Sequence, residues 1–108
     1  MEPLKIEITL DRDGTIILAG GDLELVVGRD QGAELWYTRP NKGLAIRFLA
    51  RPGPTGLALE RAPGRPEEVR LRARGFLAKV GFDLPSAQTR LELGVWDETR
   101  RVLTTRLG

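Results

Sequence analysis

The 108-residue chain contains neither cysteine nor histidine. Without cysteine it forms no disulfide, no thiolate zinc site and no cysteine nucleophile. Without histidine it also lacks the commonest metal ligand and the usual general base of enzymes. The sequence therefore predicts a protein that is not an enzyme and that holds no metal ion and no cofactor.

Other groups that carry chemistry are scarce as well. Ser86 is the only serine, and without a histidine it is expected to cap or turn the chain rather than to act as a nucleophile. Asp11 and Asp13 flank a turn, where carboxylates usually accept backbone hydrogen bonds rather than bind a divalent ion. The pair Gly20-Gly21 lacks the lysine and hydroxyl of a phosphate-binding loop and predicts a break in the chain.

Long apolar runs are also missing. No segment reaches the roughly 20 apolar residues that a membrane helix needs, and residues 1–9 mix charged with apolar positions without a signal-peptide pattern. We therefore expect a cytoplasmic protein with no membrane contact. Few Asn, Gln and Cys beside 30% charged residues is a composition typical of thermophilic proteins.

Short alternating segments separated by glycine and proline predict a mainly β protein with two short helices. The expected strands are residues 4–10, 15–18, 33–38, 44–50, 57–59, 67–73, 89–96 and 101–107. The expected helices are residues 22–27, ended by Gly28, and residues 75–81. The carboxylate of Asp22 is expected to cap the first helix, while the β-branched pair Val26-Val27 leaves a strand there as the alternative.

Residues 67–82 allow a second interpretation. Their arginines have good helix propensity, and Pro66 is acceptable in a first turn, so one continuous helix is possible. Gly75 in the middle of that helix would cost about 1 kcal/mol relative to alanine. This cost favours a strand followed by a short helix, and we keep the single helix as the alternative.

The chain also resembles itself. Residues 16–28 match residues 69–81 at a constant spacing, pairing Ile16, Leu18, Leu23, Val27 and Gly28 with Val69, Leu71, Phe76, Val80 and Gly81. After a longer gap, Glu34, Leu35, Leu44 and Leu49 match Glu92, Leu93, Val102 and Leu107. Half of a small domain cannot bury its own apolar face, so two repeats are expected to share one core.

We predict one domain, residues 1–108, with a first repeat 4–50, a linker 51–54 and a second repeat 55–108. Two tandem β-β-α-β-β halves would form a small β-barrel with internal pseudo-twofold symmetry.

Charge divides unevenly between the halves. Residues 1–54 carry seven basic and eight acidic residues, whereas residues 55–108 carry ten and seven. If residues 67–73 form a strand, Arg70, Arg72 and Arg74 project from one face at intervals suited to a phosphate backbone. The candidate nucleic-acid-binding residues are Arg65, Arg70, Arg72, Arg74 and Lys79. The alternative is a solvated face that nearby glutamates neutralise.

Residues Asp13 to Leu18, a short helix ending at Gly28, and then Ala33 to Tyr37 with a hairpin return resemble the AbrB/SpoVT family of transition-state regulators. The family resemblance implies a swapped-hairpin barrel that binds DNA with basic residues near its first turn and helix. Two such units in tandem resemble MraZ-type proteins. The segment from Phe76 to Gly81 is also similar to short bacterial proteins of unknown function. The resemblance implies a DNA-binding, transcription-regulating protein.

Two other functions compete with nucleic-acid binding. Trp36, Tyr37 and Trp96 lie on hairpin arms, where aromatic side chains usually pack in a core or against a partner. Exposed tryptophans and hairpin edges would make the chain a non-enzymatic interaction or oligomerisation module, with a second copy of the chain as one partner in a homo-oligomer. A small-ligand barrel is the third alternative, and it requires an apolar pocket with convergent polar groups.

Overall fold

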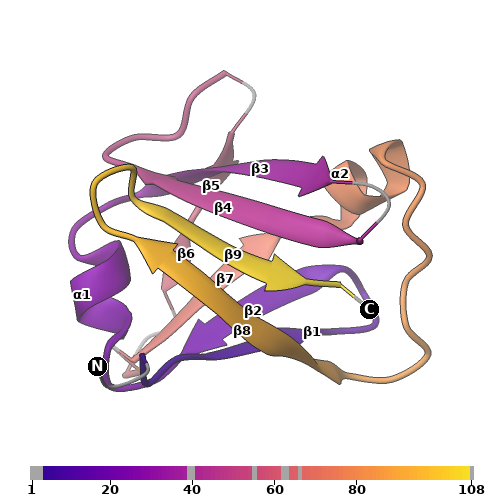
Figure 1. The fold of residues 1–108 in the computed structure, drawn as a ribbon, viewed down its shortest axis with the longest axis horizontal. Helices are drawn as coiled ribbons and strands as arrows, with labels where there is room; N and C mark the ends of the chain where they lie inside the picture. Colours follow the sequence, from indigo (N-terminus) through magenta and orange to yellow (C-terminus); the bar gives the residue numbers. More distant parts are fainter. Residues whose placement is uncertain (1–3, 39–40, 55, 62–63, 66, 108) are drawn as a thin grey trace.

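A computed structural model describes residues 4–38, 41–54, 56–61, 64–65 and 67–107, and within them the chain forms one antiparallel β-sheet and two short helices (Figure 1). The elements are β1 (Glu7–Leu10), β2 (Thr15–Ala19), α1 (Leu23–Val27), β3 (Gly32–Thr38), β4 (Gly43–Leu49), β5 (Leu57–Ala58), β6 (Glu60–Arg61), β7 (Glu68–Arg72), α2 (Arg74–Lys79), β8 (Thr89–Asp97) and β9 (Val102–Arg106). The mainly β architecture with two short helices is confirmed.

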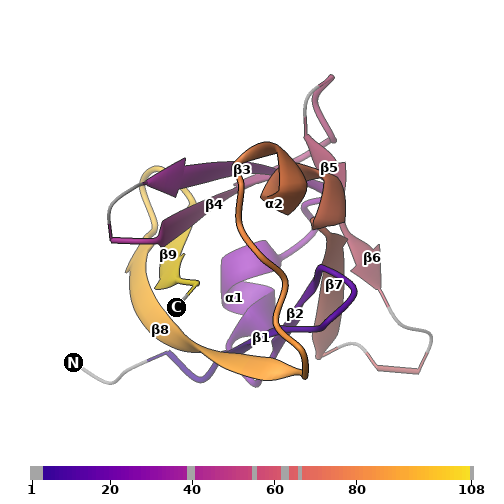
Figure 2. The same cartoon turned by 90° about the vertical axis from the view of Figure 1, so that its right-hand side faces the viewer.

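The sheet curls until its two edges nearly meet (Figure 2). Its strand order is β5-β3-β4-β9-β8-β1-β2-β7-β6. The two edge strands, β5 and β6, are separated in the chain by Leu59 alone. The N–H of Leu59 donates to the carbonyl of Gln31 at 2.9 Å, which continues the pairing of this segment beyond β3. The result is a nearly closed, barrel-like sheet, in which few backbone groups are left at open edges.

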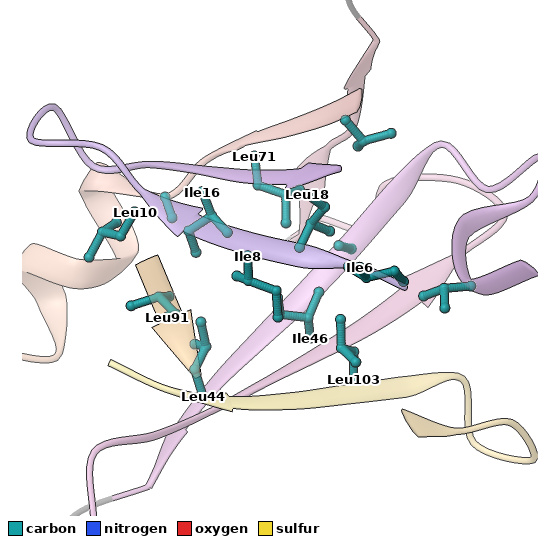
Figure 3. Close-up of a cluster of buried hydrophobic side chains, with 14 of the residues drawn as sticks. Ile6, Ile8, Leu10, Ile16, Leu18, Leu44, Ile46, Leu71, Leu91 and Leu103 are labelled. Carbon is teal, nitrogen blue, oxygen red and sulfur yellow. The ribbon is translucent and has the colours of Figure 1, made fainter. Parts of the chain in front are cut away.

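The core fills the inside of this barrel. Strand residues alternate in direction, so the apolar members of each strand face inward. Side chains of β1, β2, β4, β7, β8 and β9 meet there, among them Ile8, Leu10, Ile16, Leu18, Leu44, Ile46, Leu71, Leu91 and Leu103 (Figure 3). Burying one such side chain is worth about 1.5–3 kcal/mol. The alternation of apolar and polar residues in the sequence thus predicts both where the strands lie and which of their side chains face inward.

The two helices lie at opposite ends of the barrel (Figures 1 and 2). Helix α1 buries Leu23, Val26 and Val27, and the chain turns away at Gly28 with a positive φ of 56°. Helix α2 places Leu77 in the core. With five and six residues, these helices are too short to cross a membrane, and no longer apolar helix occurs in the described residues.

The single-helix alternative for residues 67–82 is wrong. Glu68–Arg72 forms β7, which pairs with β2 on one side and with β6 on the other. Val69 and Leu71 are fully buried, and α2 begins only at Arg74. Two neighbouring strands that offer hydrogen bonds outweigh the helix propensity of the arginines.

The carboxylate of Asp22 does not cap α1. Its Oδ2 accepts a hydrogen bond from the N–H of Lys5 at 2.7 Å, and no side-chain bond reaches the first turn of the helix. Residues 4–6, expected to be part of the first strand, therefore precede β1 and lie against the start of α1 instead. Gly20 allows this approach, because a Cβ built on it would stand 2.0 Å from the carbonyl oxygen of Lys5.

The pairing of β2 with β7 bears on the sequence repeat. Ile16 lies opposite Leu71, and Leu18 lies opposite Val69. The repeat aligns Ile16 with Val69 and Leu18 with Leu71, and an axis through the middle of this ladder would exchange them. The buried residues of the two helices do not align in this repeat. Helix α1 buries Leu23, Val26 and Val27, whereas the buried residue of α2 is Leu77, which the repeat does not align with any of them. Internal twofold symmetry stays a prediction.

Candidate nucleic-acid interface

Strand β7 directs Arg70 and Arg72 to the outside of the barrel. Val69 and Leu71, the alternating residues, are fully buried, so the arginines must point outward. Their side chains are 47% and 80% exposed. The orientation expected from the sequence is confirmed for these two arginines.

Arg74 does not continue this row, as the sequence had suggested. Strand β7 ends at Arg72, Ala73 is fully buried, and Arg74 is the first residue of α2. The backbone of Arg74 packs against the β1–β2 turn, where its Cα lies 2.7 Å from the position a Cβ on Gly14 would take. The chain turns here because the N–H of Ala73 donates to the carbonyl of Gly14 at 3.0 Å.

Lys79 stands apart from the arginines. It is the last residue of α2, five positions beyond Arg74, which is about 7.5 Å along a helix axis. Of the candidate site, Arg70 and Arg72 share the outer face of β7, Arg65 is linked to Arg70 through Glu68, and Arg74 follows β7 in the chain. We call Arg65, Arg70, Arg72 and Arg74 the arginine face.

Two glutamates lie among these arginines. Nε of Arg70 donates to Oε2 of Glu68 at 3.1 Å, and a terminal nitrogen of Arg65 lies 3.8 Å from the other oxygen of Glu68. Nε of Arg72 donates to Oε2 of Glu60, on the neighbouring strand β6, at 2.9 Å. The arginine face is therefore basic, but its positive charge is partly neutralised.

These ion pairs leave donors free. Arg70 and Arg72 each engage a carboxylate through Nε, and their terminal guanidinium nitrogens have no partner in the described part of the chain. Ion pairs this exposed are worth about 0–1 kcal/mol. The glutamates thus hold the two arginines in place only weakly, and an anion can approach the remaining nitrogens.

A third carboxylate, that of Asp13, lies in the β1–β2 turn, within electrostatic reach of Arg72. The N–H of Thr15 donates to Oδ1 of Asp13 at 3.0 Å. This hydrogen bond, together with the Thr15 hydroxyl and a smaller attraction from Arg72, lowers the pKa of the Asp13 carboxyl below its ordinary value. Asp13 is therefore negative at neutral pH and reduces the positive potential at this edge of the arginine face.

A second surface lies around Trp36, one of the tryptophans that the interaction-module alternative expects to be exposed. Trp36 is 46% exposed on β3 and Val95 is 70% exposed on β8. Tyr37 and Trp96 instead turn to the interior, where Tyr37 packs edge-on against Phe82 and Trp96 lies 6.1 Å from Phe48. The alternation of β3 contained the signal, because the inward position of Ala33 places Trp36 on the outer side.

Among the described residues, no three Asp or Glu side chains are grouped so that they could hold a metal ion. A comparison of the chain with known protein families, curated protein sequences and solved structures found no match.

Proposed function

We propose that this protein binds nucleic acid through the arginine face, without catalysing a reaction. The observation that carries the proposal is the placement of Arg70 and Arg72 on β7. Both side chains project outward from a strand that is paired on both sides, about 6.5–7 Å apart along the strand. Their free terminal nitrogens suit the bidentate recognition of phosphate oxygens.

The shape of the molecule supports an AbrB-type role. The resemblance implied a barrel with basic residues near the first turn and a helix. In this chain the β1–β2 turn packs on the start of α2, which brings Arg74 to that turn. We propose transcription regulation on duplex DNA as the corresponding function.

Electrostatics set the expected strength of binding. The arginine face holds four arginines against Glu60, Glu68 and, at its edge, Asp13, and the whole chain has a net charge of +2. Four phosphate contacts would give a slope of about −3.6 in a plot of log affinity against log salt concentration. Binding is therefore expected to be strong only at low salt and to weaken steeply as salt is added.

The test is fluorescence anisotropy with a labelled 30-base-pair duplex at several salt concentrations. Replacing both Arg70→Ala and Arg72→Ala should weaken binding at least tenfold and make the salt slope about two units shallower. Arg90→Ala is the matched control, because Arg90 is 73% exposed and also forms a surface ion pair, at 2.8 Å with Glu7. Binding by the control should stay within twofold of wild type. The proposal fails if wild type does not bind at low salt or if the double variant binds like wild type.

A further inference from the structure

A groove lies between β4 and the β8–β9 turn. Trp36 stands at its edge, and Arg47, Arg100 and Arg101 line it together with one acidic residue, Asp30. The β3–β4 and β8–β9 hairpins bring these residues together, although they are far apart in the sequence. The groove is lined by strands other than β7, on a different side of the barrel from the arginine face (Figure 2).

Trp36 offers an open aromatic surface at this groove. It lies opposite Ala45 in the β3–β4 ladder, and Ala45 lies opposite Thr104 in the next ladder. The small side chains of Ala45 on β4 and Thr104 on β9, the next two strands on this side of β3, leave the indole uncovered, and Trp36 is 46% exposed. An exposed indole is a surface on which a nucleobase can stack, whatever its identity.

The three arginines of the groove differ in their partners. Arg101 is fixed, because it donates to Oδ2 of Asp30 and to the carbonyl of Val26, both at 2.7 Å. Arg47 has no ion pair or side-chain hydrogen bond among the described residues. Among the described residues, the side chain of Arg100, 82% exposed, has only a 3.8 Å ion pair with Asp97. Two cationic side chains at the groove are therefore available to an anion.

Arg47 is also close to the tryptophan. It is two residues beyond Ala45 on the same outer face of β4, which makes it the diagonal neighbour of Trp36. Such neighbours lie about 7–8 Å apart at their backbones, within reach of long side chains. A planar ring and a guanidinium at this distance match the base and the phosphate of one nucleotide. A groove with three arginines and one acid favours that anionic ligand over an apolar protein segment.

We propose that the groove binds an unpaired nucleotide of a single-stranded nucleic acid. The base stacks on Trp36, and Arg47 and Arg100 bind the adjoining phosphate. This site goes beyond duplex binding by the arginine face and stands without it, since the two share no residue.

The test is the quenching of tryptophan fluorescence by the tetranucleotide (dT)4 at low salt. The affinity of each variant is measured by anisotropy of labelled (dT)4. Trp36→Ala should weaken binding by about tenfold or more, and Trp36→Phe should retain part of the wild-type affinity. Trp96→Phe removes the other tryptophan and should leave the quenching in place. Arg47→Ala should make the salt slope shallower by about one unit, whereas Arg12→Ala, an exposed arginine of the β1–β2 turn, should not.

Four outcomes would overturn the proposal. They are no quenching by (dT)4, unchanged affinity in Trp36→Ala, equal competition by inorganic phosphate, and a dimer in light scattering that Trp36→Ala dissociates. Circular dichroism establishes that each variant is folded. The double variant of Arg70 and Arg72 separates the two sites, because it should lose duplex binding and keep the quenching by (dT)4.

Discussion

The arginine face and the groove beside Trp36 are both basic, but they hold their charges differently. On β7, Arg70 and Arg72 are each paired with a glutamate on the surface. In the groove, Arg101 is bound to the backbone and to Asp30, while Arg47 has no side-chain partner within the described residues. On the arginine face, a bound phosphate must therefore compete with the glutamates for Arg70 and Arg72. In the groove, Asp30 is already bound by Arg101, and Arg47 remains available to a ligand.

The contrast shows that the number of basic residues is a poor guide to a binding surface. The sequence directs attention to the second half of the chain, which has most of the arginines. The groove instead takes Trp36 and Arg47 from the first half and Arg100 from the second. Availability depends on which carboxylate or carbonyl lies within reach, and the fold decides that.

The largest effect is expected from Arg101→Ala. Arg101 has a positive φ of 56° and holds the end of α1 through Val26 and Asp30, and its guanidinium lies 5.7 Å from the Trp96 ring centre. Losing these charge-assisted bonds should lower the free energy of unfolding by about 2–3 kcal/mol, which is roughly 10 °C in melting temperature. Thermal and urea unfolding measure it.

Arg100→Ala is the matched control for that change. Its side chain is 82% exposed and has a single 3.8 Å ion pair within the part of the chain that the structure describes, so its removal should change the free energy of unfolding by less than about 0.5 kcal/mol. If the two variants were equally stable, the distinction between a structural and an available arginine would be lost.

A smaller effect should separate the carboxylates of the two surfaces. Glu60→Gln together with Glu68→Gln removes the acidic partners of the arginine face, and the duplex should bind about twofold tighter for each carboxylate removed. Glu34 lies opposite Arg47 in the β3–β4 ladder, so Glu34→Gln should tighten (dT)4 binding and leave duplex binding unchanged. Anisotropy measures the affinity of each of these two variants for the duplex and for (dT)4. If each variant changed its affinity for both ligands by the same factor, binding would depend on net charge alone.

The smallest effect concerns the pH dependence of Asp13. Its pKa in the folded protein is lowered from the ordinary 3.8, chiefly by the Thr15 N–H. The ionised carboxylate therefore stabilises the fold above that ordinary value, and this contribution is lost as the pH falls through the lowered folded-state pKa. Asp13→Asn should be less stable than wild type near pH 6, with the difference shrinking toward pH 2. Melting temperatures across this range measure it, and a difference independent of pH would contradict the pKa assignment.

Several elements could be predicted from the sequence because their causes are local. Alternation identified β7 and placed Val69 and Leu71 inside, and Gly28 ended α1 with a positive φ as expected. The role of Asp22 was missed because its partner, Lys5, is 17 residues away in the sequence. Arg74 was misplaced because β7 stops where the N–H of Ala73 donates to the carbonyl of Gly14 in the β1–β2 turn.

The candidate sites depend on even longer contacts. Arg101 lies 71 residues from Asp30, and Arg72 lies 12 residues from Glu60. Alternation can place a side chain outside, as it does for Trp36, but it cannot name the neighbours that the strand on either side will provide. For that reason the sequence suggested the arginines of β7 and missed the groove.

The amino-acid sequence is sufficient to predict that this chain is mainly β, where most strands and both helices lie, and which side of the strands is buried. These features follow from side-chain direction and from turn residues, which act within a few positions of the chain. The order of the strands, the near closure of the sheet through residues 57–61, and the partners of each arginine become known from the folded chain alone. These depend on contacts between distant segments, whose energies are settled only when the barrel forms.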